Sequence, residues 1–258
     1  MTRILHLSDT HLHAPGAQTL HPEIDVRSRL EQVLERVRAY GPFDLVVVTG
    51  DVCDDGSDVA AKEVRDLLEG LAPVILAVPG NHDLSAPVRD AFGEPRAEVG
   101  PWTLIGVETQ VEGEIAGVAD GVVPALAELG ERPGVLLMHH PIVSRSSHEW
   151  FVLAGGAEAE RAVASHPAPL VVLSGHTHEP FEGRAGDAYL IGAPATYYSI
   201  RHDGPRFEFA LSRFGTAVVT LDDERLEPSV ELVMFEDEAM RGEDHLDLTV
   251  PDLLPEGP

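Results

Sequence analysis

The stretch LVVVTGD at residues 45–51 decides the fold, because a run of β-branched apolar residues ends directly on a glycine and an aspartate. Such a run predicts a strand buried on both faces, as in a parallel sheet. Four further apolar runs also end on a polar residue that binds metal well: ILHLS before Asp9, VILAVPG before Asn81, GVLLM before His139 and LVVLSG before His176. Because parallel strands bring their carboxyl ends to one edge, we expect these side chains to meet in one crevice.

Strand and helix patterns alternate over the first two-thirds of the chain. Apolar runs predict strands at 3–8, 43–49, 73–78, 102–107, 135–138 and 170–174. Helical spacing predicts helices at 25–39, at 57–68 with Ser57 as the cap, and near 157–165. Four strand-like pieces follow His178, at 188–191, 207–211, 217–221 and 230–235. We expect the last four to form a second, antiparallel sheet on the first, with helices outside both, in one α/β domain spanning 1–258.

Composition and charge narrow the classes of partner. The chain has 258 residues, is 43% hydrophobic, and carries 18 basic against 44 acidic residues, a net charge of −26. This balance argues against nucleic-acid polymers, and the acidic stretch at about 236–258 predicts a solvated tail. No apolar run approaches the roughly 18 residues of a membrane span, so we expect a cytoplasmic protein without a cleaved leader or a membrane partner. The single cysteine, Cys53, excludes an internal disulfide.

Each polar motif alone has a plain structural explanation. Asp9-x-His11 is a common hydrogen-bonded pair, Gly80-Asn81-His82-Asp83 is turn chemistry, and one His after an apolar strand is more often a core residue. All five at strand ends instead favour a shared site. Carboxylates can bridge two cations, and mixed oxygen and nitrogen ligands suit Fe, Mn, Zn or Co.

His82 and Asp83 have a different expected role from the ligands. A His that points toward the substrate can donate a proton or a hydrogen bond, so His82 is the predicted catalytic imidazole. Asp83 is predicted to orient that imidazole as an acceptor.

Together these motifs resemble the calcineurin-like metallophosphoesterase superfamily. The matching blocks are Asp9-x-His11, Gly50-Asp51-x-x-Asp54, Gly80-Asn81-His82-Asp83, His139-His140-Pro141 and Gly175-His176-x-His178. They span residues 9–178. Within the superfamily, the SDTH, PGNHD, HHP and GHTH segments resemble bacterial class III cyclic-nucleotide phosphodiesterases and related glycerophosphodiesterases.

The resemblance implies a four-layer α/β/β/α sandwich with a dinuclear site at the strand ends. Asp9, His11 and His178 would then hold one metal ion, Asn81, His139 and His176 the other, and Asp51 would bridge them. The nucleophile would be a hydroxide between the ions. Asp54 and His140 would lie beside the ligands without binding metal. The resemblance is also compatible with a homodimer, for which an edge strand would offer a surface.

The function expected from this resemblance is hydrolysis of a small phosphodiester, such as cyclic AMP or a glycerophosphodiester. A phosphomonoesterase or protein phosphatase is the first alternative, although a dianion calls for more positive charge than Arg145 and Arg201 offer near the motifs. A non-catalytic scaffold of the same fold is the second. The loops 12–24, 142–150 and 195–202 are expected to rim the pocket. The candidate substrate contacts there are Arg145, His148, Tyr197 and His202.

Overall fold

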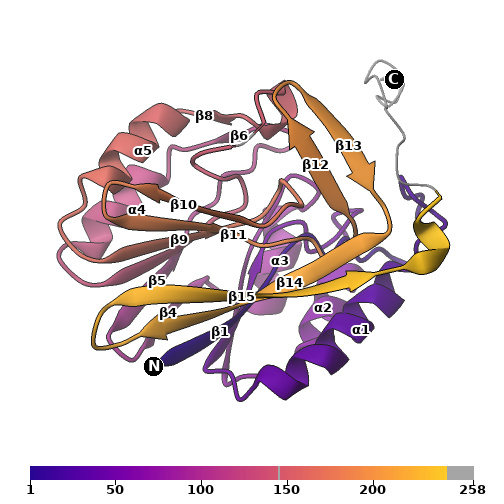
Figure 1. Cartoon of the computed structure of the whole chain (residues 1–258), viewed down its shortest axis with the longest axis horizontal. Helices are drawn as coiled ribbons and strands as arrows, with labels where there is room; N and C mark the ends of the chain where they lie inside the picture. The colour runs from indigo at the N-terminus through magenta and orange to yellow at the C-terminus, as the bar shows by residue number, and fades with distance from the viewer. Residues whose placement is uncertain (145, 243–258) are drawn as a thin grey trace.

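Two β-sheets pack face to face in the computed structural model, and helices cover the outer face of each (Figure 1). The structure describes residues 1–144 and 146–242. The predicted four-layer α/β/β/α sandwich is therefore confirmed. No helix within the described residues has both the length and the apolar surface to cross a membrane.

The first sheet has the strand order β15-β14-β1-β2-β3. Its strands are β1 (Thr2–Leu7), β2 (Leu45–Thr49), β3 (Val74–Val78), β14 (Arg213–Asp222) and β15 (Glu227–Glu236). The three N-terminal strands run parallel, and the β14–β15 hairpin joins them antiparallel beside β1. Outside this sheet lie α1 (Val26–Val37), followed by η1 (Arg38–Tyr40), α2 (Asp58–Leu67) and α3 (Ser85–Phe92). Ser57 caps α2 as predicted, since its side chain accepts a hydrogen bond from the N–H of Ala60.

The second sheet has the order β10-β11-β9-β7-β5-β4. Its strands are β4 (Arg96–Val99), β5 (Trp102–Gly106), β7 (Gly134–Leu137), β9 (Leu170–Ser174), β10 (Phe181–Ala185) and β11 (Ala188–Gly192). Its outer face is covered by α4 (Val122–Leu129) and α5 (Gly156–Ala164). Shorter elements complete the fold: β6 (Gly117–Val118) paired with β8 (Leu153–Ala154), η2 (Glu149–Phe151), the hairpin of β12 (Ser199–Asp203) and β13 (Arg206–Ala210), and η3 (Glu238–Met240).

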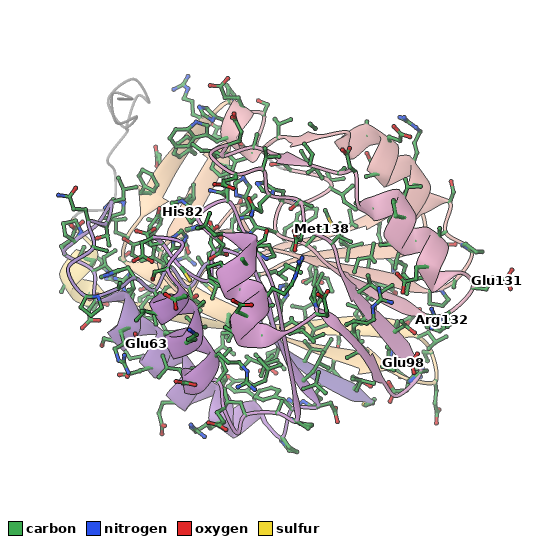
Figure 2. All side chains as sticks on the ribbon, turned by 180° about the vertical axis from the view of Figure 1, so that it is seen from behind. Glu63, His82, Glu98, Glu131, Arg132 and Met138 are labelled. Atoms are coloured by element: carbon green, nitrogen blue, oxygen red, sulfur yellow. The ribbon has the colours of Figure 1, made fainter. Side chains whose placement is uncertain are left out.

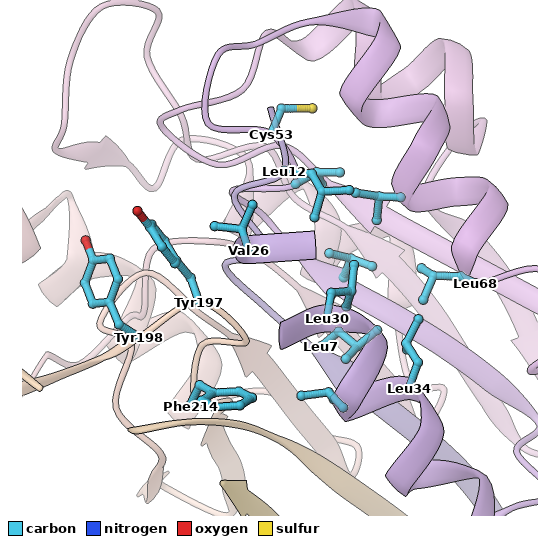
Figure 3. Packing of buried hydrophobic residues seen from close by; sticks show 14 of the residues in the cluster. Leu7, Leu12, Val26, Leu30, Leu34, Cys53, Leu68, Tyr197, Tyr198 and Phe214 are labelled. Carbon is cyan, nitrogen blue, oxygen red and sulfur yellow. The ribbon is translucent and has the colours of Figure 1, made fainter. Parts of the chain in front are cut away.

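Alternation along the buried strands divides the apolar side chains among three clusters. In β2, Leu45 and Val47 point into the layer between the sheets, whereas Val46 and Val48 face the helices. Figure 3 shows the helical side of the first sheet, where Leu30 and Leu34 of α1 lie near Leu7 of β1. Both faces of each central strand are therefore buried, which explains why these runs are continuously apolar.

The predicted composition of the second sheet was wrong. The pieces at 217–221 and 230–235 belong to β14 and β15 of the first sheet, and 188–191 pairs parallel with β9 as part of β11. The strands β5, β7 and β9, expected in the first sheet, form the centre of the second. A run buried on both faces has the same pattern in either sheet, so periodicity alone cannot assign it. Of the predicted acidic tail, residues 243–258 lie outside the described part of the chain.

Candidate metal centre and cavity

The predicted ligands lie at the carboxyl ends of strands from both sheets. Asp9 and His11 follow β1, Asp51 follows β2, Asn81 follows β3, His139 follows β7, and His176 and His178 follow β9. All are buried except Asn81, which is half-buried. The edge expected from one parallel sheet is thus formed where two packed sheets end side by side.

The backbone at these positions has an uncommon conformation. Asp9, His11, Asp51, His176 and His178 have φ values between 46° and 68°. Among the described residues, Leu226 is the only other non-glycine residue with positive φ. This left-handed conformation costs an L-residue on the order of 1 kcal/mol or more, and it persists where the surrounding structure imposes it. Its concentration at strand ends marks a functional site.

Protein acceptors fix the orientation of three imidazole rings. Nδ1–H of His11 donates to the Asp54 carboxylate at 2.9 Å, that of His139 to the carbonyl of Thr49 at 2.8 Å, and that of His178 to the carbonyl of Tyr198 at 2.8 Å. Because these oxygens can only accept, the hydrogen must sit on Nδ1 in each ring. In the neutral form of each ring, Nε2 then presents a lone pair toward the interior of the site.

The carboxylates are held by backbone N–H groups of the neighbouring motifs. Asp9 accepts from the N–H of His176 at 3.1 and 3.2 Å, and Asp51 accepts from the N–H of His82 at 2.9 Å. Oδ2 of Asp51 lies 3.5 Å from Nε2 of His11 and 3.4 Å from Nε2 of His139. Asp51 therefore faces ligands from both halves of the site.

The donor set fits divalent cations. Nε2 of His11 and Nε2 of His178 are 3.3 Å apart, and with both Nδ1 atoms protonated their lone pairs face each other. A shared cation turns this repulsion into attraction. Asp9, His11, Asp51 and His178 offer ligand atoms that all lie within 4.8 Å of one another. On the other side, Oδ1 of Asn81 lies 3.0 Å from Nε2 of His139.

His176 and His140 lie next to His139 and differ in which ring nitrogens are engaged. Nε2–H of His176 donates to the carbonyl of Trp150 at 2.8 Å, which leaves Nδ1 as its lone pair. Both nitrogens of His140 have protein partners: Nδ1 pairs with the Thr109 hydroxyl at 2.8 Å, and Nε2–H donates to the carbonyl of Ile115 at 2.9 Å. Protein contacts therefore engage both ring nitrogens of His140, although it lies with His139 and His176 in a group that could hold a metal ion.

The acceptor beside His82 is Asp54, not Asp83 as the sequence suggested. Nδ1 of His82 lies 3.3 Å from Oδ1 of Asp54, the same oxygen that accepts from His11. Asp83 is buried and accepts the N–H groups of Val52, Cys53 and Gly80 at 2.8–3.0 Å. It thereby ties the loop after β2 to the loop after β3. The His82 side chain, labelled in Figure 2, is 43% exposed.

Negative charge dominates the electrostatics of the site. Burial lowers the pKa of His139, but Asp51 outweighs burial and raises it to about 9. Burial also lowers the pKa of His82, yet Asp51 and Asp54 raise it to about 10. Burial and the charge of Asp51 raise the pKa of Asp83 to about 7, against the effect of its N–H donors. Buried carboxylates at close range therefore call for positive charge in their midst.

An aromatic-walled cavity of about 240 Å³ opens above these groups. Its polar lining residues are His11, Asp51, Asp54, Asn81, His82, His176 and His178. The remaining lining is Leu20, Ile115, Trp150, Phe151, Tyr197, Tyr198, Ile200, Phe207 and Phe209. No Lys or Arg is present among the described lining residues.

The predicted rim residues have different positions. Tyr197 lines the cavity, and its ring centroid lies 5.1 Å from that of His11. Among the described residues, His148 and His202 stand behind the wall, where they contact Phe207 and Phe151 at ring distances of 5.1 and 4.5 Å. Arg145 lies outside the described residues.

Sequence reasoning missed most of the aromatic wall. Of the chain's 2 Trp, 4 Tyr and 8 Phe, six line the cavity: Trp150, Phe151, Tyr197, Tyr198, Phe207 and Phe209. The available signal was that they come as three close pairs in residues 150–209, after the His139 motif.

Comparisons with known proteins show the family to which the chain belongs. The sequence profile of the calcineurin-like phosphoesterase family matches residues 2–180. The chain is 30% identical over 248 residues to the 3',5'-cyclic adenosine monophosphate phosphodiesterase CpdA of Pseudomonas aeruginosa, with 89% of each chain covered. It is 27% identical over 209 residues to CpdA of Escherichia coli K12, covering 75% of this chain and 76% of the relative.

Solved structures share the fold at low sequence identity. A dimetal phosphatase from Danio rerio aligns with a TM-score of 0.58 and 14% identity over 91% of this chain and 98% of its own. A protein of Thermus thermophilus aligns with a TM-score of 0.55 and 14% identity over 89% of this chain and 98% of its own. With the family profile matching most of the chain, this protein belongs to the calcineurin-like phosphoesterase family and is a metal-dependent phosphoric ester hydrolase.

Proposed function

We propose that the protein hydrolyses a small phosphodiester, with a cyclic nucleotide as the leading candidate substrate, by means of two divalent metal ions. Relatives named as cyclic AMP phosphodiesterases support the substrate class. The cavity supports a small ester as well, because its volume of about 240 Å³ lies below the roughly 300–1,000 Å³ typical of sites for drug-sized ligands.

The ligand geometry suggests how the chain holds the two ions. Asp9, His11 and His178 would hold one, through the facing Nε2 atoms and the Asp9 carboxylate. Asn81, His139 and His176 would hold the other. Asp51, which faces both His11 and His139, would be shared. When bound, such ions acidify a coordinated water and neutralise phosphate charge, which supplies a nucleophile at neutral pH.

Side chains of the protein would then orient the substrate and protonate its leaving group. His82 projects into the cavity from the loop after β3, and Asp54 holds its Nδ1. We infer that Nε2–H of His82 donates to a phosphate oxygen or to the departing alkoxide, where general acid catalysis contributes typically about 10²–10⁴-fold. The carboxylate of Asp54 also accepts from Nδ1 of His11. One residue therefore orients both a proposed metal ligand, His11, and the proposed proton donor, His82.

One observation favours a diester over a monoester. Within the described part of the chain, the cavity has no lining Lys or Arg, so little beyond the metal ions and His82 is available to bind phosphate. A monoester dianion carries one more negative charge than a diester and needs more such donors. The apolar wall, by contrast, suits the second ester group that only a diester has.

The test is a comparison of substrates. Protein reconstituted with Mn²⁺ is assayed on cyclic AMP, bis-p-nitrophenyl phosphate and p-nitrophenyl phosphate. We expect the diesters to be hydrolysed with the higher kcat/KM. A higher value for p-nitrophenyl phosphate would support a phosphomonoesterase instead. No hydrolysis of any of the three substrates by metal-loaded protein would support a non-catalytic scaffold.

A further inference from the structure

The aromatic wall is a continuous belt that joins the two histidines of the Gly175-His176-x-His178 motif. We define the aromatic belt as Trp150, Phe151, Tyr197, Tyr198, Phe207 and Phe209. Along it, the centroids of successive rings are separated by 5.3 Å for His176–Phe151, 5.4 Å for Phe151–Phe207, 5.6 Å for Phe207–Phe209, 5.3 Å for Phe209–Tyr198 and 4.7 Å for Tyr198–His178. The belt therefore begins and ends at proposed metal ligands.

The rings of the belt pack against one another without a ligand. Most of its contacts are edge-to-face, the arrangement that aromatic rings prefer, with interplanar angles of 83° for Phe151–Phe207 and 84° for Tyr198–Phe209. The supporting β12–β13 hairpin stands beside the strand ends (Figure 1), and its Gly204 is bridged to Ser146. His148 and His202 fill the space behind the wall.

The belt presents mainly apolar surface to the cavity, where Trp150 is half-buried and the other five rings are at most 6% exposed. Outside Asp54, His82 and the metal-binding groups, the polar side-chain atoms among the described lining residues are the hydroxyls of Tyr197 and Tyr198 and the indole N–H of Trp150. Both tyrosine hydroxyls point away from helix α1 in Figure 3. The hydroxyl of Tyr197 lies 3.5 Å from the carbonyl oxygen of His21. A hydroxyl can donate or accept a hydrogen bond, and an indole N–H can donate to the ring nitrogens that adenine and guanine share, so neither group distinguishes the two bases.

We propose that the aromatic belt is the subsite for the organic part of the diester and that it selects a flat aromatic group by ring area, without reading its edge. This inference rests on the proposed diesterase activity. It makes the enzyme tolerant of the base in a cyclic nucleotide and selective against diesters whose alcohols are aliphatic. Stacking of a base on aromatic side chains changes affinity by about 10- to 100-fold, whereas a built hydrogen-bonding site discriminates by about 10⁴ or more.

The first test compares kcat/KM of the Mn²⁺-reconstituted protein on cyclic AMP, cyclic GMP and glycerophosphocholine. We expect the two nucleotides to agree within about 5-fold and glycerophosphocholine to be at least about 10-fold poorer. A preference of about 100-fold for one base, or equal hydrolysis of glycerophosphocholine, overturns the subsite while the diesterase activity stands. Absence of hydrolysis of any diester overturns the proposed function itself.

The second test removes one ring of the belt. Phe207→Leu should lower kcat/KM for both nucleotides by about 10-fold and leave glycerophosphocholine hydrolysis unchanged, because only the flat group uses the ring. Phe207→Tyr keeps the ring and should restore nucleotide hydrolysis. Phe235→Leu is the matched control, since Phe235 stacks on Phe214 away from the cavity lining. An equal loss on all three substrates in Phe207→Leu, with metal content intact, contradicts a role in selecting the flat group.

Discussion

The Nε2 atoms of His11 and His178 lie 3.3 Å apart with their lone pairs facing, because Asp54 and the carbonyl of Tyr198 hold the hydrogen of each ring on Nδ1. The two residues are 167 positions apart in sequence. Such a pair is repulsive by itself and becomes attractive around a cation. The fold therefore holds two imidazoles whose mutual repulsion a shared cation would relieve.

Asp51 is the residue on which both proposed ions depend. Asp51→Asn removes a charged oxygen that faces His11 and His139, so both ions should bind more weakly. We expect activity to fall by more than the roughly 10- to 100-fold that loss of an outer hydrogen-bond partner costs. Metal content by elemental analysis should fall in parallel. Asp58→Asn, an exposed surface change, is the control, and retention of full metal by Asp51→Asn would contradict the shared role.

His82 should be separable from metal binding. Its ring is held by Asp54 and lines the cavity, outside the converging Nε2 atoms. His82→Ala should therefore keep its metal while turnover falls by about 10²–10⁴-fold, the usual contribution of a general acid. Metal analysis and turnover are measured on the same preparation. A loss of metal as large as that of Asp51→Asn would show that His82 is itself a ligand.

Asp54 should couple metal binding to turnover. Its carboxylate holds both His11 and His82, and Asn in its place keeps an acceptor but loses the charge. We expect Asp54→Asn to weaken metal affinity by about 10- to 100-fold, as measured by titration of the apoprotein. Asp55→Asn, the next residue in the same loop, should bind metal like the parent protein. Identical titrations for the two variants would remove Asp54 from this role.

Replacing Asp83 should lower the stability of the fold. Asn can accept through only one oxygen, so Asp83→Asn leaves at least one of the N–H groups of Val52, Cys53 and Gly80 without its partner. The expected loss is about 1–3 kcal/mol in free energy of unfolding, measured in urea on the metal-loaded protein, in which cations beside Asp51 offset its repulsion of the Asp83 carboxylate. Asp44→Asn changes an exposed acceptor of one N–H and should cost less. Equal stability of the two variants would contradict the bracing role.

The convergence of these polar residues at one site was predictable because their signal in the sequence is local. A continuously apolar run specifies a buried strand, and the polar residue at its end specifies what lies at the sheet edge, as for Val48 and Asp51. The assignment of strands to sheets was not predictable. A continuously apolar strand such as β9 would suit the centre of either sheet, since its side chains are buried on both faces. Which sheet a strand joins depends on pairing between distant segments.

Contacts between loops were also not predictable from the sequence. Asp83 stands beside His82 in sequence, yet Asp54, 28 residues away, takes the contact with its imidazole. The aromatic wall likewise assembles from η2, the segment before β12, and β13. These three segments meet only in the folded protein. No periodic pattern in the sequence connects Trp150 with Phe207.

Metal stoichiometry tests the central account most directly. Protein freed of metal by chelation is titrated with Mn²⁺, and a crystal structure of the loaded form is solved with the anomalous signal of manganese. We predict two ions per chain, with the Asp51 carboxylate between them and His11 and His139 on opposite ions. A single ion, or two ions with Asp51 bound to neither or to one alone, would contradict it.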